Sequence, residues 1–223
     1  MERIIFVKNN IKGIIFDFDG VIVDSEPFWD RVDEMIIEQE GVRFIPEIKN
    51  RVMGLAPLLS VIELCRVHNI KTPPEILLKR REDLMKKFYE TAIELNYGAY
   101  ETLEYLHNKG LKLALASSTP KRLFESALKR FNIDRFFDVI VTSEDVESSK
   151  PNPEIFIRAQ ELLSLPKSEL IIVEDSRAGI EAAIASGIEV IWLKNVSTDI
   201  KDLSPDYIIN SLSDIRLCFE KKS

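Results

Sequence analysis

The chain has few of the residues on which several protein classes depend. Its two cysteines, Cys65 and Cys218, show no metal-binding spacing and make no disulfide framework. Its two histidines, His68 and His107, also lack a metal-type spacing, and we assign them no role. A reducing, intracellular setting is the simpler interpretation of this cysteine usage.

Long apolar runs are absent as well. The N-terminal segment holds a run of four apolar residues, Ile4 to Val7, before Lys8, which is too short for a signal peptide. No other stretch approaches the roughly 20 residues that a membrane span requires. We therefore expect a cytoplasmic protein with no membrane partner.

Positive charge is in deficit. Lys and Arg total 30 against 37 Asp and Glu, a net charge of −7, which argues against general binding to nucleic acid or anionic lipid. A hydrophobic content of 45% in 223 residues is that of an ordinary globular protein with a sizeable core. We expect a small molecule as the partner, no nucleic acid, and a monomer.

What the chain does contain is an alternation of short β-branched runs with helix-period segments, which predicts an α/β fold with a Rossmann-like parallel sheet. Most of the runs are continuously apolar, as expected for strands covered on both faces. Intervening helices are predicted to begin at Thr119–Pro120, with Thr119 as N-cap, and at Asn152–Pro153. The candidate strands cover residues 14–17, 111–117, 139–142, 170–174, 190–193 and 207–209.

The exception is residues 25–96, where strand signals vanish and the pattern is helical throughout. Trp29 lies at helical spacing with apolar neighbours and is expected in the core rather than against a substrate. A helical block directly after the first strand predicts an inserted α-helical cap domain. We divide the chain into an α/β core, residues 1–23 and 97–223, and a cap, residues 24–96, with hinges near 23–26 and 96–99. The first ten residues are read either as an edge strand or as a loose arm.

Acidic, hydroxyl and lysine side chains stand at the carboxyl ends of the predicted strands or in the loops that follow them. In open parallel sheets, ligands bind at the carboxyl ends of the strands, near the switch in strand order. Together these residues predict a site for phosphate and a metal ion. They are Asp17, Asp19 and Gly20 after the first strand, Ser117, Ser118 and Thr119 after the second, Lys150 after the third, and Glu174 and Asp175 at the fourth.

Each residue type has a physical role in such a site. Asp17 and Asp19, two apart on extended backbone, can point to the same side, and two such carboxylates repel unless a cation neutralises them. With Asp175 as a third acid, a hard cation with oxygen ligands is expected, and we expect Mg²⁺. Ser117 offers a hydroxyl donor. Lys150 supplies a mobile positive charge that suits phosphate and keeps Asp17 ionised.

Four ordered segments carry a family resemblance: FDFDGVIVDSEP (residues 16–27), ALASSTP, SSKPNPEIF and IIVEDSRAGIEAAIASG. From about residue 11 to residue 213 the sequence resembles the haloacid dehalogenase superfamily. Within that superfamily it is similar to the branch with a helical cap, which contains β-phosphoglucomutase and sugar-phosphate phosphatases. The resemblance implies a HAD-like core, a cap and Mg²⁺-dependent phosphoryl transfer.

The resemblance also implies residue roles. Asp17 corresponds to the nucleophile that forms an aspartyl-phosphate, and Asp19 to the acid and base that protonates the leaving oxygen and activates water. The phosphate-binding residues correspond to Ser117, Ser118 and Lys150. The Mg²⁺ ligands correspond to Asp17, the backbone carbonyl of Asp19, and Asp175, with Glu174 as a ligand or as support for the ligands.

The family that the sequence resembles includes enzymes of several different activities. Asp19 disfavours a dehalogenase, which needs no second acid at that position, and no cap lysine can be placed for phosphonate hydrolysis. The serious rival is a β-phosphoglucomutase-type phosphosugar mutase. Its cap typically has a histidine where this chain has Trp29, and an arginine where it has Pro57.

We therefore expect a phosphatase that hydrolyses a small phosphomonoester such as a sugar phosphate, with the mutase as the alternative. A non-catalytic protein that binds a phosphorylated metabolite is a further alternative of a different class, because a fold does not determine its function.

Overall fold

The computed structural model of the protein describes residues 10–52, 55, 57–195 and 198–219. Its centre is a six-stranded, fully parallel sheet with the order β3-β2-β1-β4-β5-β6. The strand order reverses between β1 and β4, which is where ligands bind in doubly wound folds. The strands are β1 (Gly13–Phe16), β2 (Lys112–Ser117), β3 (Val139–Thr142), β4 (Leu170–Glu174), β5 (Glu189–Leu193) and β6 (Tyr207–Ile209).

Both faces of the sheet are buried at its central strands, β1 and β4. Along β1, Ile14 and Phe16 belong to one hydrophobic cluster, while Ile15 between them belongs to another. This alternation follows from the two-residue period of a strand, and it explains why the strands read as unbroken apolar runs in the sequence. The predicted fold class is confirmed.

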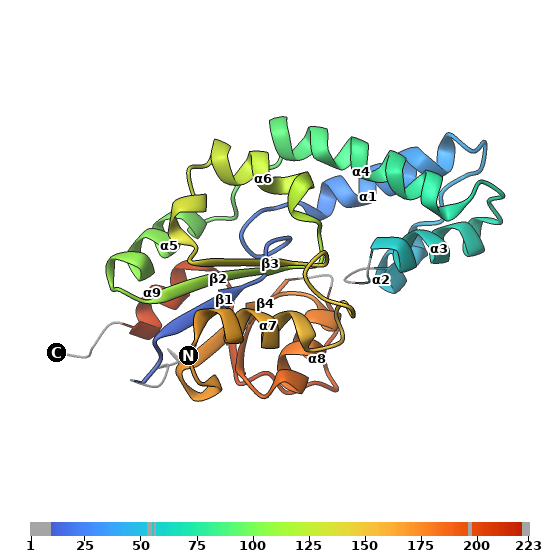
Figure 1. Cartoon of the computed structure of the whole chain (residues 1–223). Helices are drawn as coiled ribbons and strands as arrows, with labels where there is room; N and C mark the ends of the chain where they lie inside the picture. Colours follow the sequence, from blue (N-terminus) through green and yellow to red (C-terminus); the bar gives the residue numbers. More distant parts are fainter. Residues whose placement is uncertain (1–9, 53–54, 56, 196–197, 220–223) are drawn as a thin grey trace.

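Helices form a layer on each face of the sheet (Figure 1). One layer contains α7 (Glu154–Leu163), which packs on β1, β2 and β3, and α8 (Arg177–Ser186), which packs on β4 and β5. The other contains α5 (Ala99–Asn108), α6 (Lys121–Arg130) and α9 (Ser213–Phe219). Short 3-10 turns, η2 (Asp134–Phe136) and η3 (Lys167–Glu169), precede β3 and β4.

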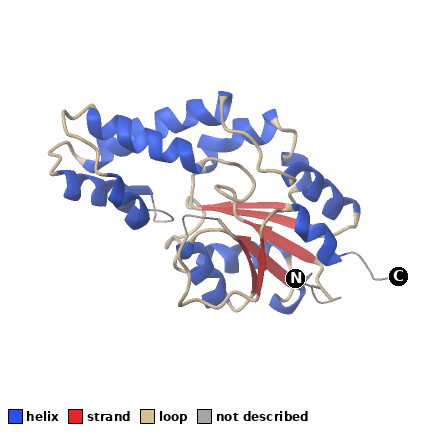
Figure 2. Ribbon diagram, turned by 180° about the vertical axis from the view of Figure 1, so that it is seen from behind, coloured by secondary structure: helices blue, strands red, loops and turns tan. Residues whose placement is uncertain are grey.

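Between β1 and β2 the chain leaves the sheet and forms a helical insertion that extends to one side of the molecule (Figures 1 and 2). Within it, α4 packs against α1 and α3, and also against α6 of the core. The regular elements among the described residues of the insertion are all helices, as predicted; its status as a separate domain stays a prediction. Its elements are α1 (Glu26–Glu38), η1 (Pro46–Ile48), α2 (Lys49–Val52), α3 (Pro57–His68) and α4 (Pro74–Thr91).

The two segments that connect the insertion to the sheet are bonded to each other. Asp24 N–H donates to the carbonyl of Glu94 at 3.0 Å, and Asn96 N–H donates to the carbonyl of Ile22 at 2.9 Å. The Asn96 side chain adds bonds to the carbonyls of Gly20 and Val21, at 2.8 and 2.9 Å. The predicted hinge positions thus lie side by side; movement about them stays a prediction.

Some sequence predictions differ from the structure. Thr119 is not the N-cap of α6, because Pro120 occupies that position with an extended backbone and the helix begins at Lys121. Pro120 has ψ of 135°, outside the helical region, so it is not the first helical residue and the N-cap position moves one residue along the chain. The prediction for the first ten residues, an edge strand or a loose arm, falls on residues 1–9, which lie outside the described part of the chain. No helix of the described residues has both the length and the apolar character that crossing a membrane requires.

Candidate active site

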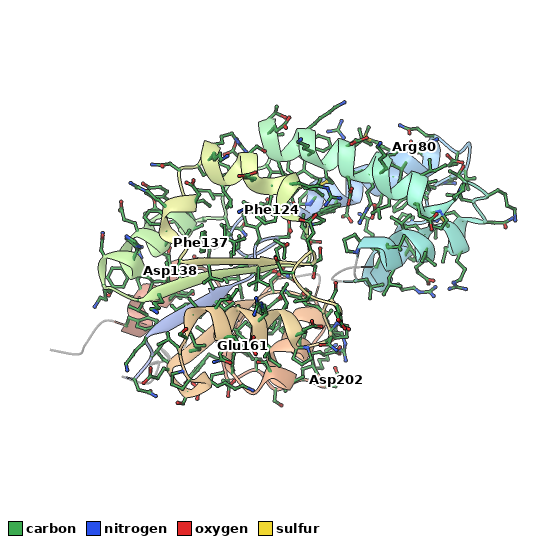
Figure 3. All side chains as sticks on the ribbon, viewed as in Figure 1. Arg80, Phe124, Phe137, Asp138, Glu161 and Asp202 are labelled. Carbon is green, nitrogen blue, oxygen red and sulfur yellow. The ribbon has the colours of Figure 1, made fainter. Side chains whose placement is uncertain are left out.

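The loop after β1 is anchored by its middle residue. Phe18, between the two aspartates, is fully buried and packs on Phe124 of α6, with ring centroids 4.4 Å apart (Phe124 is labelled in Figure 3). Gly20 follows with φ of +82°, and a Cβ there would lie 2.3 Å from a carboxylate oxygen of Asp175. The loop therefore requires glycine at this position both for its backbone conformation and for the approach of Asp175.

Lys150 joins the ends of three strands. Its Nζ lies 2.5 Å from Oδ1 of Asp17 and 2.6 Å from Oε1 of Glu174, and it donates to the carbonyl of Ala116 at 3.2 Å. Burial alone would lower the pKa of this lysine, but the two carboxylates outweigh burial and raise the pKa. Lys150 is therefore held as a buried cation, and both of its carboxylate partners are fixed in place.

One of the two carboxylate oxygens of Asp17 is free of hydrogen bonds within the described residues. Oδ1 accepts from Lys150, whereas Oδ2 accepts no hydrogen bond from the described residues, and the residue lines a cleft. Burial raises the pKa of Asp17 to about 8 against the attraction of Lys150, and repulsion from Glu174 and Asp19 adds to the rise. The Asp17 carboxylate is thus short of positive charge, and added positive charge would favour its ionised form.

Glu174 is held by donors on both oxygens. Oε1 accepts from Lys150, and Oε2 accepts from the N–H groups of Asp175 and Ser176 and from the Ser176 hydroxyl, at 2.8 to 3.1 Å. Gly179 of α8 makes room for this carboxylate, since a Cβ there would lie 1.9 Å from it. This geometry favours a supporting role for Glu174 over direct coordination.

Three buried acids gather where the strand order reverses. Ligand oxygens of Asp17, Glu174 and Asp175 all lie within 4.8 Å of one another. Burial, followed by repulsion from Glu174 and Asp17, raises the pKa of Asp175 well above its usual value. A divalent cation with a preference for oxygen ligands would neutralise this cluster, so the residues present fit Mg²⁺.

Asp19 accepts hydrogen bonds from five side chains. Oδ1 accepts from Ser25 at 2.6 Å, from the Tyr89 hydroxyl, and from the Trp29 indole at 3.5 Å. Oδ2 accepts from Thr119 at 2.7 Å and from Ser117 at 3.4 Å. Three of these donors come from the insertion or its start, one from the last residue of β2 and one from the loop that follows, so Asp19 connects the two parts of the molecule.

The hydroxyls of Ser117, the last residue of β2, and of Ser118, which follows it, are placed differently. Ser117 is fully buried, donates to Asp19, accepts from the Thr119 N–H at 3.0 Å, and is not among the residues that line the cleft. Ser118 does line the cleft, and its hydroxyl has no hydrogen-bond partner among the described residues. An unpaired hydroxyl beside Asp17 and Lys150 is what a bound phosphate oxygen would satisfy.

The cleft lies between the carboxyl ends of the strands and the helical insertion. On the core side it is lined by residues of the loops after β1, β2, β3 and β4. On the other side the lining comes from α1, α2, α3 and α4. The described lining residues are Asp17, Asp19, Glu26, Trp29, Asp30, Asp33, Lys49, Val52, Leu55, Pro57, Ser60, Arg81, Ser118, Thr119, Lys150, Glu174 and Ser176.

This acid cluster on a doubly wound sheet has a counterpart among known proteins. The sequence pattern of the haloacid dehalogenase-like hydrolases matches residues 14–193. The chain belongs to this family. A relative from Thermotoga maritima, named phosphorylated carbohydrates phosphatase, is 34% identical over 182 residues, which cover 82% of this chain and 84% of the relative.

Solved structures agree with the family assignment. A Thermotoga maritima protein provisionally named β-phosphoglucomutase is 29% identical, with a TM-score of 0.74 over 93% of this chain and 98% of that one. The β-phosphoglucomutase of Clostridium difficile, at 19% identity, has a TM-score of 0.80 over 92% of this chain and 93% of its own, and it shows the fold alone. The predicted family and the prediction of an enzyme of the phosphatase type are confirmed.

The structure brings most of the predicted site residues of this HAD-like hydrolase together. Asp17, Asp19, Ser118, Lys150 and Glu174 line one cleft, and Asp175 lies in the acid cluster beside it. Ser117 lies next to them but turns its hydroxyl to Asp19. Their individual roles stay predictions.

Sequence reasoning missed the partners of Asp19. Ser25 stands at the N-cap position of α1, yet its hydroxyl makes no cap hydrogen bond and donates to Asp19 instead. Thr119 was read as a cap, and Tyr89 received no role. Trp29, expected in the core, does pack against the core but also lines the cleft. The sequence feature that could have indicated these partners is the hydroxyl-rich SST segment, residues 117–119, which the sequence analysis assigns to phosphate binding.

Proposed function

We propose that this HAD-like hydrolase is a Mg²⁺-dependent phosphatase that hydrolyses a small phosphomonoester, such as a sugar phosphate, through an aspartyl-phosphate on Asp17. One observation carries the proposal. Asp17, fixed through Oδ1 by the buried Lys150, keeps Oδ2 free in the same cleft as Asp19, a second carboxylate. A nucleophilic carboxylate beside a second acid is what a two-step phosphoryl transfer requires.

In the first step, the free oxygen of Asp17 attacks phosphorus and the bond from phosphorus to the leaving oxygen breaks. Asp19, protonated for this step, gives its proton to that oxygen, so the product leaves as a neutral alcohol. Lys150 and the unpaired hydroxyl of Ser118 face the phosphoryl oxygens and stabilise their charge.

In the second step, the ionised Asp19 takes a proton from water as that water attacks the aspartyl-phosphate. The bond from phosphorus to Asp17 breaks, and orthophosphate and the original enzyme are restored. The same carboxyl group therefore serves first as acid and then as base, and the proton balance closes over one turnover.

Mg²⁺ would be held by the carboxylates of Asp17 and Asp175 and by the backbone carbonyl of Asp19, with Glu174 orienting its neighbours. When bound, it supplies positive charge that favours ionised Asp17 and attracts phosphate oxygens. The raised pKa values of Asp17 and Asp175 support this assignment, because both carboxyls lack sufficient counter-charge by themselves.

In this proposal the acceptor of the phosphoryl group is water and not a second sugar hydroxyl. A mutase of this branch holds a second phosphate with cap residues at two positions, and here these are Trp29 and Pro57, which both line the cleft and carry no charge. The glycine of the mutase turn, three residues before that arginine position, corresponds to Gly54, which lies outside the described residues. The Thermotoga maritima relative, whose name specifies phosphorylated carbohydrates, supports the same substrate class.

We also propose that residues 24–96 act as a cap that closes over the bound phosphoester.

The test is phosphate release from p-nitrophenyl phosphate and a panel of sugar phosphates, with and without Mg²⁺, for the wild type and Asp17→Asn. We expect turnover with Mg²⁺ and a loss of about a thousandfold or more in the variant. Its fold should be retained, as measured by circular dichroism, because Lys150 still contacts Glu174. Asp83→Asn on the exposed side of α4 is the control.

Two results would contradict the proposal. An active Asp17→Asn variant would refute the nucleophile. Rapid conversion of β-glucose 1-phosphate to glucose 6-phosphate, primed by glucose 1,6-bisphosphate, would place the mutase first.

A further inference from the structure

The wall of the cleft formed by the insertion has a charge pattern of its own. We call this wall the distal wall and define it by Glu26, Trp29, Asp30, Asp33, Lys49 and Arg81, which all line the cleft. It faces the part of a substrate that is not the phosphate, because Asp17, Ser118 and Lys150 stand on the opposite side. Its chemistry therefore bears on the leaving alcohol.

Both cations of the distal wall are already paired. Arg81 of α4 binds Asp33 of α1 with two bonds, Nε to Oδ1 at 2.6 Å and Nη2 to Oδ2 at 3.0 Å, and both side chains are buried. The guanidinium also lies over the Trp29 ring, 4.4 Å from its centroid. A planar bidentate pair of this kind leaves little positive charge for a ligand.

The second cation is Lys49 of α2, whose Nζ lies 2.6 Å from Oδ2 of Asp30 on α1. Both side chains are 39% exposed, so this pair stands at the rim of the cleft. Lys49 is the one distal cation that solvent and an entering ligand can reach, and Asp30 neutralises it there.

Glu26 is the unpaired group of the distal wall. It is partly buried, lines the cleft, and has no hydrogen-bond or ion-pair partner among the described residues. Burial raises its pKa to about 7, and repulsion from Asp19 and Asp30 adds to the rise. A carboxylate in this position lacks a donor, and a hydroxyl group of a ligand can supply one.

The net charge of the whole cleft also favours a leaving group without negative charge. Its described lining residues include six carboxylates and three cations, a formal charge of −3. A bound divalent cation and a phosphate dianion cancel each other and leave this balance unchanged. A leaving group that carries a carboxylate or a second phosphate would therefore enter a negatively charged site in which each described cation already has an acidic partner.

We propose that the distal wall selects phosphomonoesters whose leaving group is a neutral polyol, with Glu26 accepting a hydrogen bond from a substrate hydroxyl. Asp30 and Asp33 exclude a second anionic group by holding Lys49 and Arg81. This selectivity rests on the proposed phosphatase function and assigns it a substrate class. Glu26 is its specificity-determining residue, and Asp30 is the residue that keeps anionic competitors out.

The experiment measures kcat/KM for three groups of substrates with Mg²⁺. Neutral leaving groups are represented by glycerol 3-phosphate and glucose 6-phosphate, anionic ones by phosphoglycolate and fructose 1,6-bisphosphate, and p-nitrophenyl phosphate is the reference without a polyol. The variants are Glu26→Gln and Asp30→Asn. The controls are Glu34→Gln on the exposed face of α1 and Asp83→Asn on α4.

We expect the wild type to prefer the neutral polyols over the anionic substrates by tenfold or more. Glu26→Gln should lower kcat/KM for the polyols, relative to p-nitrophenyl phosphate, by about tenfold, because a hydrogen bond to a charged acceptor is lost. Asp30→Asn should raise kcat/KM for the anionic substrates several-fold, because it frees Lys49. Taking ratios to the reference substrate removes any general effect of a variant on folding.

Two results would overturn the selectivity. One is a wild type that hydrolyses the anionic substrates as well as the polyols. The other is a Glu26→Gln variant whose ratio changes no more than that of Glu34→Gln. A wild type that releases phosphate from none of the substrates, the reference included, would instead refute the phosphatase function and the selectivity with it.

Discussion

The hydroxyl of Tyr89, at the end of α4, donates a hydrogen bond to Oδ1 of Asp19, 70 residues earlier in the chain. Tyr89 is fully buried, and its ring packs near Phe18 and Phe124 of the core, with centroids 6.0 and 6.4 Å away. The proposed acid and base is thus oriented directly by the insertion. Any movement of α4 relative to the core must change what Asp19 contacts.

Removing this hydroxyl tests the relationship. Tyr89→Phe keeps the ring in its packing and removes one donor to a carboxylate, so we expect kcat to fall about tenfold. KM should change little, because Tyr89 is not among the residues that line the cleft. Tyr97→Phe, at a position 86% exposed, is the matched control. A normal kcat in Tyr89→Phe would show that the remaining donors orient Asp19 by themselves.

Removal of Mg²⁺ tests whether the cluster of Asp17, Glu174 and Asp175 binds the metal. Without Mg²⁺ we expect no turnover, and at a Mg²⁺ concentration of 100 Kd the ion should stabilise the fold by about 2.7 kcal/mol. In a chain of this size that corresponds to a rise in Tm of roughly 5–10 °C. Asp175→Asn should remove most of this rise in a thermal melt, whereas Asp83→Asn should keep it. A Tm that responds equally to Mg²⁺ in Asp175→Asn would place the ion elsewhere.

The carboxyl of Glu26 predicts a pH dependence of stability. Its pKa is raised from 4.5 to about 7, so between these values the folded state binds more protons than the unfolded state. Stability therefore falls as the pH rises through this window, by at most about 3 kcal/mol from this one group. We expect Glu26→Gln to lose less stability than the wild type between pH 5 and pH 7 in chemical denaturation. The same slope in Glu26→Gln, Glu34→Gln and the wild type would contradict the assignment.

At Gly179 we expect a glycine-to-alanine substitution to lower stability, the opposite of its usual effect in a helix. Replacing a glycine inside a helix by alanine normally stabilises the helix by up to about 1 kcal/mol. In α8, however, the added Cβ would lie 1.9 Å from the Glu174 carboxylate, which is pinned by Lys150 and Ser176. We expect Gly179→Ala to be destabilised by about 1–3 kcal/mol and to lose activity as Glu174 shifts. A stabilised and fully active variant would show that Glu174 has room to move.

Much of the fold was predictable because its signals are local. For β3, β4 and β6 the predicted and observed bounds coincide, since each is a run of branched or aromatic apolar residues bounded by turn residues. The acidic strand ends followed from the same pattern, because parallel strands bring their carboxyl ends to one edge. The predicted helix start at Thr119 is wrong, because Pro120 has ψ of 135° and itself occupies the N-cap position, a backbone conformation that the Thr-Pro pair does not determine.

The sequence by itself determined the α/β architecture, the family, and the set of strand-end residues that meet in the cleft. Only the tertiary structure decided what each hydroxyl and charge near them contacts. Ser25, Tyr89 and Thr119 converge on Asp19 from 6, 70 and 100 residues away, and Arg81 reaches Asp33 across 48. Such contacts depend on how α1 and α4 pack against the core, and no local periodicity encodes that packing. Glu26, an ordinary acid in the first turn of a helix, stands out only when the cleft around it leaves it unpaired.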